Sequence, residues 1–144
     1  IHDYFECDYE HNYETIFRYS DIKVTPHKNT NRLLIDSGDS LTLIPVSENE
    51  QPILRIEENY FGSHAKNVMT PTSIYQLNNS GSFHSTYLIK VINDESDIEK
   101  IKLDQKIEND VCKIELIDEN GERITMAISI AKVSDEKLFS FNIH

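Results

Sequence analysis

One short segment of the sequence combines residues that could carry out acid–base catalysis. It reads Leu33-Leu34-Ile35-Asp36-Ser37-Gly38. A carboxylate that directly follows an apolar strand is held in a defined position, while the small serine and glycine leave room for a second loop of the same kind. Two carboxylates that approach each other in this way share one proton, so that one acts as an acid and the other as a base.

In this window the chain resembles the retroviral and retrotransposon aspartic proteases. The resemblance implies a catalytic role for Asp36, a second aspartate from an identical partner chain, and a later apolar-apolar-Gly segment beside the catalytic loop. The sequence contains a single Asp-Ser-Gly, no later glycine follows two aliphatic residues, and Asp39 stands where the family usually has alanine. The same residues are typical of a turn between strands. We therefore predict that Asp36 ends a strand and is not catalytic, and a homodimeric retropepsin-like protease is the enzyme alternative.

Metal-ligand residue types gather near the start of the chain, at His2, Asp3, Cys7, Asp8 and His11. Structural zinc sites use paired ligands at short, defined spacings, which this group lacks. We interpret it as a solvated acidic segment and predict no metal and no cofactor.

The sequence has two cysteines, Cys7 and Cys112. An even count is compatible with one disulfide or with two ordinary buried thiols. Cys112 shares an alternating apolar face with Ile114 and Leu116, and Cys7 lies in an aromatic-rich stretch. We hypothesise that the two cysteines form a disulfide.

Composition and charge exclude several classes of function. The chain has 144 residues, of which 38% are hydrophobic and 27% charged, and its formal net charge is −11. Such an acidic chain disfavours binding to nucleic acid or anionic lipid, which requires clustered lysine and arginine. No apolar run is long enough to span a membrane, so we expect no membrane insertion. The sequence begins at Ile1 without a methionine, from which we expect that a preceding segment has been removed.

Apolar residues recur with a period of two along most of the chain, which is typical of half-buried strands. Two such runs flank Asn120-Gly121, and this pair predicts a hairpin with a type I′ turn, in which both central residues have a positive φ. Residues 8–19 fit either a helix or a strand. Further strands are predicted around Ile22 and Val24, Leu33 to Ile35, Leu41 to Val46, Ile53 to Ile56, Phe83 to Val91, Ile101 and Leu103, and Phe139 to Ile143.

These patterns predict an all-β fold, a two-layer antiparallel β-sandwich of immunoglobulin-like or jelly-roll-like type, with residues 1–144 as a single domain. Residues 58–82 show no sustained period and are predicted to form one long loop, with a short strand at Ser73 to Leu77. Aromatic residues beside a glycine in such a loop often form a recognition surface. Tyr60, Phe61 and His64 are therefore the candidate partner-binding residues.

The absence of a convincing catalytic set favours a non-enzymatic module that binds another protein or has a structural role. The predicted disulfide and the acidity favour an extracytoplasmic location, periplasmic or at the cell surface. An alternative is a cytosolic, acidic, immunity-type inhibitor that neutralises a basic toxin through charge complementarity.

Overall fold

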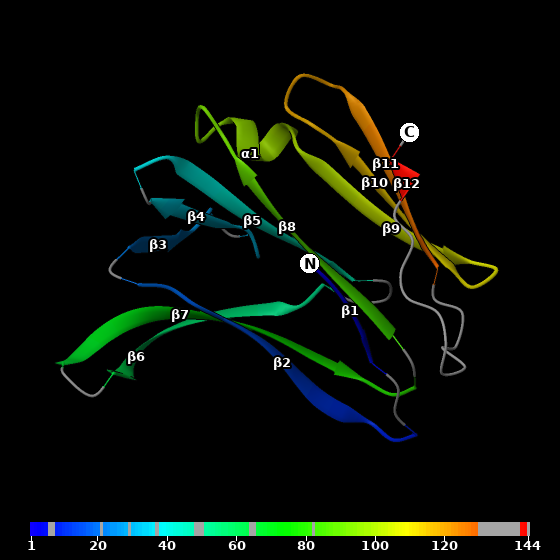
Figure 1. Ribbon diagram of the computed structural model, residues 1–144. Helices are drawn as coiled ribbons and strands as arrows, with labels where there is room; N and C mark the ends of the chain where they lie inside the picture. Colours follow the sequence, from blue (N-terminus) through cyan, green and yellow to red (C-terminus); the bar gives the residue numbers. More distant parts are fainter. Residues whose placement is uncertain are drawn as a thin grey trace. The chain divides into compact units, whose positions relative to one another are not determined.

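The computed structural model describes residues 1–5, 8–20, 22–28, 30–36, 38–47, 51–63, 66–81, 83–129 and 142–143. These residues form an all-β fold with three antiparallel sheets and one short helix (Figure 1). The predicted all-β class is confirmed, but there are three sheets where the sequence predicted two. The chain divides into two compact units, Ile1–Asn93 and Asp94–His144. The prediction of a single domain over residues 1–144 stays a prediction.

The first unit contains two sheets. A five-stranded sheet has the order β1-β8-β5-β4-β3, and a three-stranded sheet has the order β2-β7-β6. The strands are β1 (His2–Phe5), β2 (His11–Arg18), β3 (Lys23–Pro26), β4 (Leu33–Asp36), β5 (Ser40–Ser47), β6 (Ile53–Ser63), β7 (Lys66–Asn79) and β8 (Phe83–Val91). Every strand pair is antiparallel.

Both sheets of this unit contribute to one apolar core. Leu33 and Leu43 from the five-stranded sheet are fully buried and cluster with Tyr75 of β7. The ring of Tyr87 on β8 lies 5.2 Å from that of Phe17 on β2 and 5.4 Å from that of Tyr75. Offset and edge-on aromatic pairs of this kind each add roughly 0.5–1.5 kcal/mol beyond the burial of their area. The aromatic residues therefore hold the two sheets together.

Two tyrosines of the core differ in how their hydroxyls are satisfied. The Tyr19 hydroxyl lies 2.8 Å from the Ser73 hydroxyl, within hydrogen-bond distance. The Tyr75 hydroxyl is buried and has no hydrogen-bond partner among the described residues. Burial raises the pKa of Tyr75, which stays neutral. The Tyr75 hydroxyl therefore bears a desolvation cost that the Tyr19 hydroxyl avoids.

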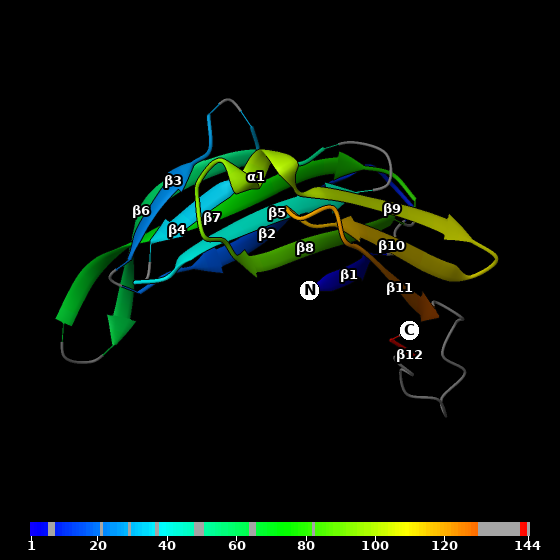
Figure 2. The same cartoon turned by 90° about the horizontal axis from the view of Figure 1, so that it is seen from above.

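The predicted long loop at residues 58–82 is wrong, because most of it forms strands. β6 and β7 pair from Ile53↔Gln76 to Ser63↔Lys66 and form a long hairpin (Figures 1 and 2). Sequence reasoning failed here because β7 carries threonine and asparagine where a half-buried strand would alternate apolar residues. Pro71 also argued against a strand. The strand tolerates it because Pro71 lies just beyond the last residue of β7 that pairs with β2.

The ambiguous segment at residues 8–19 is resolved as strand β2. It pairs with β7 from His11↔Asn79 to Arg18↔Thr72. Tyr13, Thr15 and Phe17 are half-buried, whereas Glu14, Ile16 and Arg18 between them are exposed. The period of two therefore prevails over the helical spacing in this segment.

The second unit contains the third sheet, with the order β12-β11-β10-β9. Its elements are α1 (Asp97–Lys100), β9 (Lys102–Glu108), β10 (Val111–Ile117), β11 (Arg123–Ser129) and β12 (Asn142–Ile143). Alternate residues of β10, namely Cys112, Ile114 and Leu116, are buried as the sequence predicts. Most of the predicted strand from Phe139 to Ile143 lies outside the described residues.

The hairpin across Asn120-Gly121 is confirmed, but its turn is not of type I′. β10 and β11 end their pairing at Ile117↔Arg123, which leaves a five-residue loop. In this loop only Gly121 has a positive φ, of 85°. A type I′ turn occurs instead between β9 and β10, where Asn109 and Asp110 have φ values of 52° and 60°. Asn and Asp tolerate this left-handed conformation better than other residues with a side chain.

Candidate functional site

The aspartate suggested by the protease resemblance lies at a simple strand turn. Asp36 is the last residue of β4, is exposed, and pairs with Ser40 at the start of β5. Gly38 adopts a φ of 99°, a conformation that favours glycine. The predicted strand end and turn are confirmed. The absence of a catalytic role for Asp36 stays a prediction.

The predicted partner-binding residues fall in the β6–β7 hairpin. Tyr60 and Phe61 belong to β6, where the register pairs Tyr60 with Met69 and Phe61 with Val68. His64 lies outside the described residues. Of these four paired residues, Met69 is the one whose side chain the structure describes, and it is 48% exposed.

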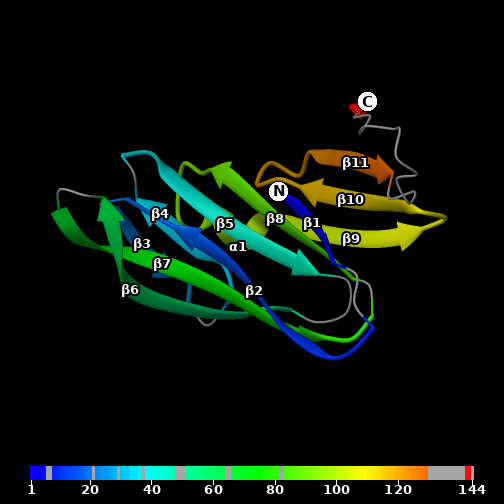
Figure 3. The same ribbon diagram turned by 60° about the horizontal axis from the view of Figure 1, so that its bottom comes forward.

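The end of the hairpin extends beyond the third strand of its sheet. β2 stops at Arg18, opposite Thr72, whereas β6 and β7 stay paired as far as Ser63↔Lys66 (Figure 3). The main-chain amide of Tyr19 still donates to the carbonyl of Pro71 at 3.1 Å. Beyond Pro71, the described residues of β6 and β7 form a ribbon of two strands without a third. A ribbon of two strands is marginally stable in water unless another surface covers it.

The face of the three-stranded sheet that points away from the core, the outer face, is organised around Arg55. It consists of Glu14, Ile16 and Arg18 of β2, Thr72, Ile74 and Gln76 of β7, and Ile53, Arg55 and Glu57 of β6. The Arg55 guanidinium contacts the carboxylates of Glu57 at 2.6 Å and Glu14 at 3.3 Å. These exposed ion pairs each contribute about 0–1 kcal/mol. Ile16 and Ile53 are 44% and 68% exposed, so the outer face combines paired charges with open apolar side chains.

Two histidines meet where β1 pairs with β8. Nε2 of His2 lies 3.1 Å from Nδ1 of His84, and Nδ1 of His2 lies 2.8 Å from the Thr86 hydroxyl. Burial, followed by the neighbouring His2, lowers the pKa of His84 to about 4, and burial also lowers the pKa of His2. One ring nitrogen must donate and the other accept, so the hydrogen bond requires at least one of the two rings to be neutral. Among the described residues no three histidine, cysteine or carboxylate groups come together to bind a metal.

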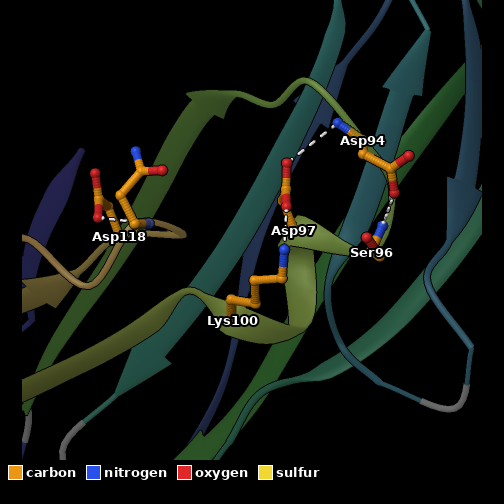
Figure 4. Close-up of polar contacts among 6 residues, drawn as sticks. Asp94, Ser96, Asp97, Lys100 and Asp118 are labelled. Carbon is orange, nitrogen blue, oxygen red and sulfur yellow. Dashed lines mark hydrogen bonds and ion pairs between the residues drawn. The ribbon is translucent and has the colours of Figure 1, made fainter.

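Acidic residues gather at one end of the third sheet, where the connection to β9 meets the β10–β11 loop. The Asp97 carboxylate accepts hydrogen bonds from the Lys100 ammonium at 2.7 Å and from the Asp94 amide at 3.3 Å (Figure 4). Asp94 accepts from the Ser96 amide at 2.8 Å, and hydrogen bonds from Ser96 lower the pKa of Asp94. These carboxylates bind the amides and the lysine of their own turns. These hydrogen bonds within one segment account for the positions of the Asp94 and Asp97 carboxylates.

A loop anchor in the same region escaped sequence reasoning. Oδ1 of Asp118 accepts hydrogen bonds from the amides of Asn120 at 2.9 Å and Glu122 at 2.8 Å. The Gly121 amide donates to the Asp118 carbonyl at 3.0 Å. An aspartate at the first position of a turn was the available signal, because Asp side chains often bind amides two residues further on. The side chain of Asp118 therefore sets the form of this loop.

The predicted disulfide stays a prediction. Cys112 is buried on β10, and Cys7 lies outside the described residues. The hypothesis therefore rests on the sequence pattern alone.

No protein family, curated protein sequence or solved structure matches the chain. No helix in the described part of the chain has the length and apolar character needed to cross a membrane.

Proposed function

We propose that this chain is a non-enzymatic β-sandwich module, of immunoglobulin-like or jelly-roll-like type, that binds another protein through the end of its β6–β7 hairpin. We further propose that it acts outside the cytoplasm. The shared core of the five-stranded and three-stranded sheets supports the sandwich type. A formal net charge of −11 supports a protein partner over nucleic acid.

The observation that carries the proposal is the two-stranded end of the hairpin. Its register pairs Tyr60 with Met69 and Phe61 with Val68. Met69 is 48% exposed, which shows an apolar side chain available for contact. Aromatic residues and methionine are enriched at the centres of protein interfaces.

Photo-crosslinking tests this function in the organism that produces the protein. A benzophenone amino acid at Met69 should give a crosslinked product of discrete mass. The same group at Ile124 on β11, which is 41% exposed, should not, and this position serves as the matched control. The double variant Tyr60→Ala/Phe61→Ala should abolish the product without lowering the melting temperature.

Two results would contradict the proposal. Equal crosslinking at Met69 and Ile124 would show that contact is non-specific. A double alanine variant that unfolds while its remaining folded fraction still crosslinks would show that Tyr60 and Phe61 complete the core and take no part in binding.

A further inference from the structure

Strand β2 forms one edge of the three-stranded sheet, and β6 forms the other. The order β2-β7-β6 gives β2 one neighbour, and the described residues provide no strand on its other side. All eight residues from His11 to Arg18 pair with β7 in a continuous register. The free edge of such a strand presents a row of backbone amides and carbonyls that a further strand can pair with.

β2 has few of the devices that keep sheet edges apart. Edge strands are commonly protected by a bulge, a proline, a very short length or a lysine at the centre. β2 has a regular register and no proline, and the residue at the centre of its exposed face is Ile16, which is 44% exposed. Glu14 and Arg18 stand two residues away on either side of Ile16, and they carry opposite charges.

This arrangement is self-complementary. In an antiparallel pair of identical strands with the twofold axis at Ile16, Glu14 of each copy lies opposite Arg18 of the other, and the two Ile16 residues face each other. An axis at Glu14 or Arg18 would oppose like charges, and an axis at Thr15 or Phe17 would place Ile16 opposite a charged residue. Opposite charges across neighbouring strands are favourable and like charges are unfavourable. Within β2, the axis at Ile16 is therefore the complementary register.

The pairing also extends a row that the single chain already contains. Ile16 pairs with Ile74, and Ile74 pairs with Arg55. A second copy would double this row into four adjacent isoleucines, with an Arg55 at each end. We propose that β2 pairs antiparallel with β2 of a second copy of this chain, about a twofold axis at Ile16, to form a continuous six-stranded sheet.

One strand pair makes a small interface, and a net charge of −11 on each copy opposes association. The dimer is therefore weak and is to be measured by sedimentation equilibrium up to high micromolar concentrations. The substitution Arg18→Glu places an acidic side chain opposite Glu14 at both ends of the paired region. The substitution Glu14→Arg places a basic side chain opposite Arg18 at both ends. Because each single variant replaces two attractive cross-strand pairs with two repulsive ones, it should weaken the dimer by about tenfold.

Combining the two changes provides the decisive test. An equimolar mixture of the Arg18→Glu and Glu14→Arg proteins should form a heterodimer as tight as the wild-type dimer, because the mixed pairing removes the like-charge contacts of the two homodimers. The double variant Glu14→Arg/Arg18→Glu should restore the homodimer, because each cross-strand pair is again of opposite sign. Lys113→Glu and Glu108→Arg on the third sheet make the same changes in net charge and should leave self-association unaltered.

A chain that stays monomeric at every concentration would overturn the proposal. So would a dimer that the single variants do not weaken, or a double variant that fails to associate while circular dichroism shows it to be folded. The test is independent of the hairpin, since Tyr60→Ala/Phe61→Ala should not change self-association through β2.

Discussion

Replacement of Asp118 by alanine should destabilise the second unit by about 2 kcal/mol. One carboxylate oxygen accepts two amide hydrogen bonds, at 2.9 and 2.8 Å, and the residue is 9% exposed. Hydrogen bonds to a charged group contribute roughly 1.5–3 kcal/mol each, which gives at least about 3 kcal/mol for two bonds. The amides lie in an exposed loop and regain water once the carboxylate is gone, so the expected total loss is smaller, about 2 kcal/mol.

Thermal unfolding and amide exchange measure this effect together. A loss of about 2 kcal/mol corresponds to a fall in melting temperature of roughly 4–8 °C for a chain of this size. The amides of Asn120 and Glu122 should exchange faster in Asp118→Ala. Asp118→Asn keeps one acceptor oxygen and should lose less than half as much stability. If Asp118→Ala melts at the wild-type temperature, or if the asparagine variant is equally damaged, the carboxylate does not anchor the loop.

Individual side chains elsewhere in the chain lead to four further predictions. The pKa of His84 is about 4 in the folded state and near 6.5 in the unfolded state. The free energy of unfolding should therefore fall as the pH decreases from about 6.5 to about 4. Urea titrations at several pH values should show a smaller fall for His84→Asn. Tyr75→Phe should be neutral or gain up to about 1 kcal/mol in denaturant unfolding, whereas Tyr19→Phe should lose about 1 kcal/mol with its hydrogen bond. Asp110→Gly should preserve the β9–β10 turn and its melting temperature, whereas Asp110→Val should cost about 1–2 kcal/mol. Asp36→Asn should change stability by less than about 0.5 kcal/mol, and acid-dependent peptide cleavage that this variant abolishes would refute the proposal that the chain is not an enzyme.

Strands with one buried face could be predicted from the sequence. In β10 the buried residues Cys112 and Ile114 alternate with the exposed residues Lys113 and Glu115. The sequence therefore shows both the two-residue period and which residues belong to the buried face. Local turn chemistry was less visible. The Asn-Gly pair suggested a type I′ turn, but Asp118 stabilises a longer loop, and the type I′ turn formed at Asn109-Asp110, which lacks glycine.

Contacts between distant segments could not be predicted. His2 and His84 are separated by 82 positions and meet only because β1 pairs with β8. The same limit applies to Arg55, whose partner Glu14 lies on a strand that reaches it across β7. Sheet order determines these contacts, and a single sequence does not encode sheet order in any local pattern.

β7, the central strand of the three-stranded sheet, was the hardest strand to recognise from the sequence, and its place in the sheet explains why. β7 is the central strand, and its outer-face residues include Thr72 and Ile74, which are buried although they point away from the core. The edge strands provide their cover, because Ile16 flanks Ile74 on one side and Arg55 flanks it on the other. Because the neighbouring strands cover β7, its sequence does not have to alternate strictly between apolar and polar residues. Threonine can take the place of valine, so the two-residue period typical of a strand is lost in this segment. The side chains of β2 and β6 thus protect their central neighbour, while no strand among the described residues pairs with the outer edge of either. The sheet that was hardest to recognise from the sequence is therefore the one on which both the proposed dimer and the proposed protein interface depend.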